Sequence, residues 1–228
     1  MTRRLLFLPC RVSLLKLSRK AAKAQSKICA FASLRDRKKI ESLAMNQKII
    51  TECHLIDDIL EPRRETFSSK SDFVGYRNHC LRMLNFVLCL SKPEVDREEK
   101  IAIATALHDL TIFPDQTVAY LEPAVELAEL YLTSINRQEW SAEIAAMIRN
   151  HHKIRTYKSE FANLVESMRQ ADWIDVSFGK LRFGLPKSYV REVHQAFPTY
   201  SFYPSAIAKV LGSYAIKHPL NPLPILRW

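Results

Sequence analysis

Glycine is scarce in this chain, and its scarcity removes two large classes of function. Only four of the 228 residues are glycine, and they are far apart: Gly75, Gly179, Gly184 and Gly212. The dinucleotide-binding loop follows the pattern G-x-G-x-x-G, and the phosphate-binding P-loop follows G-x-x-x-x-G-K-[ST]. Neither pattern can be assembled from these positions. The sequence therefore excludes dinucleotide-binding and P-loop chemistry.

Long apolar runs and paired cysteines are also missing. The stretch MLNFVLCL ends at Ser91-Lys92 and is far shorter than the roughly 18 apolar residues that a membrane-spanning helix needs. The five cysteines include no C-x-x-C pair, and their odd number leaves at least one thiol outside any disulfide. Free thiols are typical of a reducing compartment. We therefore expect no membrane span and a cytoplasmic location.

The positive charge of the chain is confined to one end. The net charge is +10, but residues 1–44 contain 12 Lys and Arg against 2 acidic residues, whereas residues 45–228 contain 22 of each sign. Because residues 45–228 carry equal numbers of basic and acidic residues, we do not expect them to bind nucleic acid. The basic, Ser-containing and nearly acid-free extension has the composition of a mitochondrial transit peptide. Two other interpretations stay open: a dispensable extension with Met45 as the true start, or a basic helix that docks on the body.

Apolar residues recur at three- and four-residue spacing through most of residues 45–228, and the alternation typical of strands is rare. This pattern predicts an all-α fold, with a single helical bundle domain over 45–228. The predicted helices cover residues 46–60, 72–91, 97–110, 123–133, 140–151, 160–177, 187–196 and 204–216. Asp96 and Glu99 have the D-x-x-E form of a capping box at the start of the helix predicted over 97–110.

The segment REEKIAIATALHDL, residues 97–110, raises the first chemical question. It is charged in its first turn and then apolar on every face, which predicts a helix in the centre of the bundle. His108 and Asp109 close this segment, and buried polar side chains need partners. Adjacent helical residues point about 100° apart, so both side chains reach one point only if it lies beyond the helix end, as a metal ion would.

Three further segments place imidazole or carboxylate groups on apolar helix faces. His79 lies in YRNHCLRM, His151 and His152 end the segment AAMIRNHHK, and Asp172 lies in RQADWID. A lone inward histidine is often only a hydrogen-bonded core residue, with an aspartate as its partner. The order H…HD…HH…D, spread over four separate helices, favours a shared metal site over four unrelated core residues.

This order resembles the HD superfamily of metal-dependent phosphohydrolases. The resemblance covers roughly residues 72–178, and the motifs that carry it are YRNHCLRM, ALHDL and RQADWID. The runs MIRNHHK, ADWIDVSFGKLRFGLP and NPLPILRW are similar to those of a little-characterised bacterial and fungal subgroup. The resemblance implies an all-α fold with one divalent metal held by His79, His108, Asp109 and Asp172. Some branches bind a second ion through further histidines, for which the candidates are His151 and His152.

The implied activity is hydrolysis of a phosphoester of a small molecule or nucleotide by a metal-activated water. Mixed imidazole and carboxylate ligands suit Mn, Fe, Co, Ni or Zn. Asp109 would bind the metal and orient the attacking water, and Asp175, one turn after Asp172, would fix a ligand histidine. Basic residues beside the ligands could neutralise a phosphate, or could equally be solvated surface charges; they are Arg77, Arg149 and Lys153.

One departure from the superfamily pattern narrows the range of expected substrates. Nucleotidases of this superfamily commonly carry a glutamate three residues after the HD aspartate, and this position is Ile112 here. The departure disfavours hydrolysis of nucleoside monophosphates. Two alternatives to a phosphohydrolase stay open. One is a metal-dependent hydratase or lyase on a small nitrile-like substrate, because one fungal branch hydrates cyanamide; the other is a non-catalytic helical module.

Overall fold

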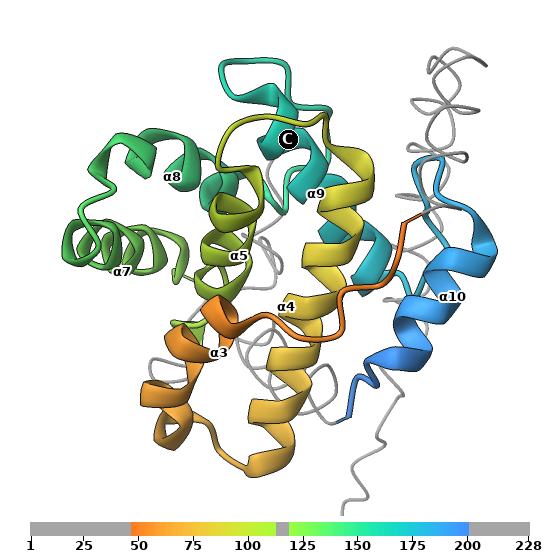
Figure 1. Ribbon diagram of the computed structural model, residues 1–228, viewed down its shortest axis with the longest axis horizontal. Coiled ribbons are helices and arrows are strands. Elements are labelled where there is room, and N and C mark those ends of the chain that lie inside the picture. The colour runs from red at the N-terminus through yellow and green to blue at the C-terminus, as the bar shows by residue number, and fades with distance from the viewer. Residues whose placement is uncertain (1–46, 113–118, 201–228) are drawn as a thin grey trace, which may run out of the picture.

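The helix that carries the first histidine begins at a serine cap. In the computed structural model, which describes residues 47–112 and 119–200, Ser69 Oγ accepts a hydrogen bond from the backbone N–H of Asp72 at 3.1 Å. This bond satisfies one of the free N–H groups of the first turn, and α4 then runs over Lys70–Leu90 with most of its side chains buried. In Figure 1, α4 lies between α5 and α10, with α9 behind it.

The described residues form helices and no strand, so the predicted all-α fold is confirmed for them. In chain order the elements are α3 (His54–Leu60), the 3-10 helix η2 (Glu61–Thr66), α4, α5 (Arg97–Leu107), α7 (Leu121–Ser134), the 3-10 helix η3 (Gln138–Trp140), α8 (Ser141–Asn150), α9 (Ala162–Val176) and α10 (Lys187–Ala196). None of these helices combines the length and the apolarity that crossing a bilayer requires.

The described helices pack around one large apolar core, and Ile112, Tyr120 and Leu121 form a small separate cluster. α4 packs against α9 and α5, α7 packs against α8, and α10 lies along another side of α4 (Figure 1). α5 is buried from Ile101 to its end at Leu107, because it is apolar on all faces and neighbours cover each of them. The end of α5 therefore lies inside the protein, where α4, α8 and α9 can all supply side chains to it.

The prediction for residues 46–60 is wrong in its first half. The helix begins only at His54, and residues 47–53 are not helical. Asn85 of α4 explains the difference, because its side chain accepts from the N–H of Ile50 at 2.9 Å and donates to the Ile50 carbonyl at 3.0 Å. Both main-chain groups of Ile50 are thus paired with a side chain instead of with a helical turn.

Two further details around α5 differ from the sequence prediction. Asp96 has a left-handed backbone (φ 55°) and its side chain makes no capping hydrogen bond, so the predicted capping box is wrong. The helix also ends at Leu107, three residues early, and leaves His108 and Asp109 in a turn. The helix predicted over 204–216 and the proposed extension 1–44 lie outside the described residues.

The described cysteines give a first test of the packing. Cys80 and Cys89 are buried, Cys53 is half-buried, and all three are free thiols. Burial raises the pKa of the Cys89 thiol to about 11, so only about 1 in 1,000 Cys89 side chains is a thiolate at pH 8. We expect iodoacetamide to label Cys53 faster than Cys89 or Cys80 in the native protein, as measured by peptide mass spectrometry. Equal labelling of all three before urea is added would contradict this packing.

Candidate metal centre

Four segments that are distant in sequence bring their polar side chains together in the core. α4 supplies His79, the turn after α5 supplies His108 and Asp109, the turn after α8 supplies His151 and His152, and α9 supplies Asp172 and Asp175. All are buried except His152, whose side chain is 14% exposed. Buried polar groups at this density require either complete hydrogen bonding or a bound ion.

The rings of His79 and His108 face each other through their Nε2 atoms. His79 Nδ1 lies 2.6 Å from Asp175 Oδ2, and His108 Nδ1 lies 2.8 Å from the Thr105 carbonyl. Both oxygens only accept, so each Nδ1 carries a proton, and in the neutral form of each ring the lone pair is on Nε2. The two Nε2 atoms are 3.1 Å apart. Burial lowers the pKa of His108 to about 3, so this imidazole is neutral at physiological pH.

His151 repeats this arrangement beside Asp109. Its Nδ1 donates to the Ile148 carbonyl at 2.6 Å, which leaves a lone pair on Nε2. That atom lies 3.2 Å from Asp109 Oδ1, and neither atom has a hydrogen-bond partner among the described residues. Burial by itself would raise the pKa of Asp109, but the imidazoles of His108 and His151 hold it well below its ordinary value. The lowering needs positive charge beside the carboxylate, and a metal ion between Asp109 Oδ1 and His151 Nε2 would supply that charge.

These atoms fit a metal ion better than they fit one another. His79, His108 and Asp109 form one group that could hold an ion, and Asp109, His151 and His152 form a second, with the ligand atoms of each group within 4.8 Å of one another. A cation would turn the repulsion between facing lone pairs into attraction. Imidazole nitrogen and carboxylate oxygen together are the donor set of a divalent transition ion. The cluster is compatible with the HD-type motif, and Asp109 belongs to both groups.

Asp172, the fourth ligand implied by the resemblance, belongs to neither group. Its Oδ2 accepts from His152 Nδ1 at 3.1 Å, and its buried Oδ1 has no hydrogen-bond partner among the described residues. The bond to Asp172 holds the proton of His152 on Nδ1. The Asp172 charge also raises the pKa of His152 against the opposing effect of burial. The role of Asp172 as a metal ligand stays a prediction.

Tyr120 is a member of the cluster that the sequence interpretation missed. Its hydroxyl is hydrogen-bonded to His152 Nε2. Since Nδ1 of His152 carries the proton, the tyrosine O–H is the donor in this bond. Burial, together with the charges of Asp109 and Asp172, raises the pKa of Tyr120 well above its ordinary value, so it keeps that proton. Nothing local in the segment AYLEP marks this tyrosine, which reaches its partner across 32 residues.

Two groups on the far side of His79, the buried Arg82 and the half-buried His194, were also missed. Arg82 is fully buried and bonds both oxygens of Asp175, at 2.5 and 2.8 Å. His194 of α10 places Nε2 3.7 Å from Asp175 Oδ1. Asp175 thus contacts His79, and its role in fixing a ligand histidine stays a prediction. An arginine inside the apolar stretch CLRMLNFVLCL was the available signal, because a buried guanidinium requires a buried anion.

The basic residues named as phosphate-binding candidates differ in their ion pairing and in their position relative to the histidines. Arg77 makes a two-bond ion pair with Asp57 of α3, at 2.5 and 2.7 Å, and Arg149 is paired with Glu122 of α7. The structure does not bring either of them to the histidines. Lys153 follows His152 directly, and its ammonium lies 5.7 Å from the centre of the Tyr157 ring. Within the described residues, Lys153 forms no ion pair.

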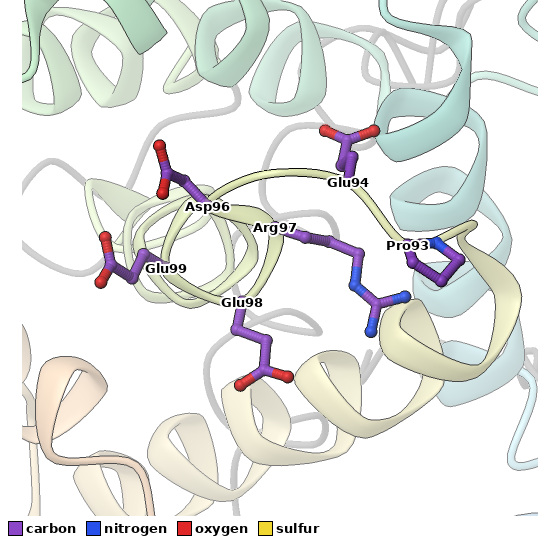
Figure 2. Close-up of a pocket in the computed structure, with 6 residues that line it drawn as sticks. All are labelled: Pro93, Glu94, Asp96, Arg97, Glu98 and Glu99. Atoms are coloured by element: carbon purple, nitrogen blue, oxygen red, sulfur yellow. The ribbon is translucent and has the colours of Figure 1, made fainter.

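An acidic surface pocket lies at the opposite end of α5 from His108. It has a volume of about 340 Å³ and is lined by Pro93, Glu94, Asp96, Arg97, Glu98 and Glu99 (Figure 2). Acidic residues collect there because the first turn of a helix favours negative charge. The pocket contains none of the residues of the histidine cluster and is separate from it.

Comparisons with family models, with curated proteins and with solved structures found no match to this chain.

Proposed function

We propose that this protein is a metal-dependent hydrolase of the HD type that cleaves a phosphoester of a small molecule. The observation that carries the proposal is the convergence of three Nε2 atoms, from His79, His108 and His151, on the ionised Asp109. In the neutral form of each ring, this nitrogen carries the lone pair because its Nδ1 donates to an oxygen. Such a set binds a cation and has no equally good use in an apolar core.

The residues around this centre have separable roles. A divalent ion held there would lower the pKa of a bound water and polarise the phosphorus–oxygen bond. Asp109 would accept a hydrogen bond from the attacking water and so fix its direction. His152 is the most exposed histidine of the cluster and would meet the substrate; Asp172 and Tyr120 hold its ring. Lys153 would neutralise charge on the phosphate.

The experiment that tests the proposal is metal analysis combined with an activity screen. Protein purified without chelator is expected to contain about one or two equivalents of a transition metal by elemental mass spectrometry. It should hydrolyse at least one phosphoester from a panel of small phosphomonoesters and phosphodiesters, and removal of the metal should abolish that activity. Absence of metal, with normal helical content, would mean that the cluster is structural and that the protein is a non-catalytic module.

A second candidate function is favoured by the pairing of the arginines. Because Arg77 and Arg149 are neutralised by carboxylates, Lys153 is the one residue of the three candidates left to meet a phosphate. A site with little positive charge also suits a neutral substrate, such as a small nitrile that the enzyme hydrates.

Replacement of Lys153 separates the two functions. For a phosphohydrolase we expect Lys153→Ala to lower kcat/KM about 10- to 100-fold, because a charge-assisted bond to phosphate contributes about 1.5–3 kcal/mol. For a nitrile hydratase we expect little change. The measurement is kcat/KM on the best phosphoester and on cyanamide. Full phosphoesterase activity in the variant would contradict the role of Lys153.

We also propose a cytoplasmic location for the protein. The three described cysteines are free, which agrees with a reducing compartment.

A further inference from the structure

Arg82 is a charged residue for which the proposed chemistry has no use. It lies on α4 one turn after His79, and its side chain is completely buried. Its Nε and Nη2 donate to the two oxygens of Asp175, and its Nη1 donates to the Phe197 carbonyl at 2.7 Å. A single guanidinium thus joins α4, α9 and the residue that follows α10.

Stability alone does not account for such a group. Burying an ion pair costs desolvation energy that the attraction of the pair often fails to recover, and apolar residues of similar volume serve a core equally well. The pair here has a second feature, because Asp175 Oδ2 is shared between Arg82 Nη2 and His79 Nδ1. The arginine therefore holds the carboxylate from one side while the histidine contacts it from the other.

Helix geometry explains how this arrangement is built. His79 and Arg82 are three residues apart on α4 and lie on one face, as do Asp172 and Asp175 on α9. The two helices pack against each other, so the faces meet. The bond from Arg82 to Phe197 adds a third fixed point, and Asn78 donates to the next carbonyl, that of Pro198, at 2.8 Å.

We propose that Arg82 is a positioning residue for the metal centre: its guanidinium fixes the Asp175 carboxylate so that Oδ2 accepts the Nδ1 proton of His79 and Nε2 of His79 points at the metal. The inference rests on the proposed function, because it assigns Nε2 of His79 to a metal. It concerns how the site is held, and it assigns to Arg82 an effect on the proposed ligand His79 that is exerted through Asp175.

The test uses Arg82→Lys, which keeps the positive charge. A single ammonium cannot bond both carboxylate oxygens and the Phe197 carbonyl in the geometry of the planar guanidinium. Two readouts are combined: affinity for Co²⁺, from titration of its visible absorption, and the tautomer of His79 in the metal-free protein, from long-range ¹H–¹⁵N correlation spectra. We expect Co²⁺ binding to weaken about 10- to 100-fold, the usual effect of losing an outer partner of a metal ligand. His79 should change from the Nδ1–H tautomer to a mixture.

A matched control separates positioning from loss of stability. Lys100→Met removes another interhelical ion pair, the one between Lys100 of α5 and Glu143 of α8 at 2.9 Å, at the end of α5 away from His108. We expect this variant to lose stability and to keep both the Co²⁺ affinity and the His79 tautomer of the wild type. A second variant, Asp175→Asn, should weaken Co²⁺ binding as well. The double variant Arg82→Lys/Asp175→Asn should bind no more weakly than the weaker single variant, because both changes break one chain of contacts.

The outcomes are distinct. The inference is overturned if Arg82→Lys keeps the wild-type tautomer and binds Co²⁺ within twofold of the wild type. It is also overturned if Lys100→Met weakens Co²⁺ binding as much as Arg82→Lys does. Failure of the wild type to bind Co²⁺ would refute the proposed function, and the His79 tautomer in the metal-free variants would still decide whether Arg82 sets that side chain.

Discussion

With both His108 and Asp109 replaced by alanine, the protein is expected to purify without bound transition metal and to bind added Co²⁺ at least about 100-fold more weakly than the wild type. The reason is the shared position of Asp109. It belongs to both groups of potential ligands, while His108 belongs to the first, so the double replacement leaves neither group intact. Elemental mass spectrometry and Co²⁺ titration measure the effect.

The double variant should keep its helices, because both residues follow the last residue of α5 and alanine keeps the backbone N–H groups that bond the Ala104 carbonyl and the Tyr76 hydroxyl. The matched control is His54→Ala/Asp58→Ala, which removes one imidazole and one carboxylate from exposed positions on α3. This control should retain the metal. Normal metal content in His108→Ala/Asp109→Ala would show that the ion is held elsewhere and would refute the proposed centre.

Replacement of Arg82 by methionine is expected to lower the free energy of unfolding of the metal-free protein by about 3–5 kcal/mol. Methionine fills much of the same space but leaves Asp175 buried without its guanidinium, and a buried carboxylate that loses its counter-ion is costly. Burial would raise the pKa of Asp175, and in the intact pair the Arg82 charge and the His79 bond lower it below its ordinary value instead. Urea denaturation followed by circular dichroism measures the change.

The companion variant removes both charges. Arg82→Met/Asp175→Asn should recover part of the stability lost in Arg82→Met, because no unpaired charge remains and the asparagine oxygen can still accept the His79 proton. The cost in Arg82→Met would then belong to the unpaired carboxylate. If the double variant is as unstable as Arg82→Met, the loss comes from packing and from the missing bond to the Phe197 carbonyl.

The sequence predicts those features that a single helix determines. The apolar periodicity of residues 187–196 predicted α10 with its observed bounds, and the fully apolar segment before His108 predicted the central position of α5. The inward histidines were predicted for the same reason: His79 stands on the buried side of α4, and His108 and His151 directly follow the last residues of α5 and α8. What the pattern could not show is where α5 ends, because that depends on His108 Nδ1 bonding the Thr105 carbonyl in a turn.

Features that depend on long-range contacts were not predicted from the sequence. The non-helical segment 47–53 is set by Asn85, 35 residues from Ile50, and local propensity favours a helix there. Arg77 stands two residues from His79, yet its guanidinium is paired with Asp57 of α3. Tyr120 and Arg82 reach the cluster only because helices distant in sequence pack together. Adjacency in sequence therefore failed as a guide to which charges surround the histidines.

The bond between His79 and Asp175 also has a consequence for the order in which the chain becomes functional. The two residues are 96 positions apart, and Arg82 reaches Phe197 across 115. During synthesis from the N-terminus, α4 leaves the ribosome long before α9. His79 and Arg82 therefore have no bond to Asp175 until α9 has been made. Contacts of such sequence separation carry a high loop-closure cost and slow folding. Metal capture by this cluster would therefore mark completion of the native state, and an immature chain that lacks α9 would expose His79 without the carboxylate that fixes its tautomer.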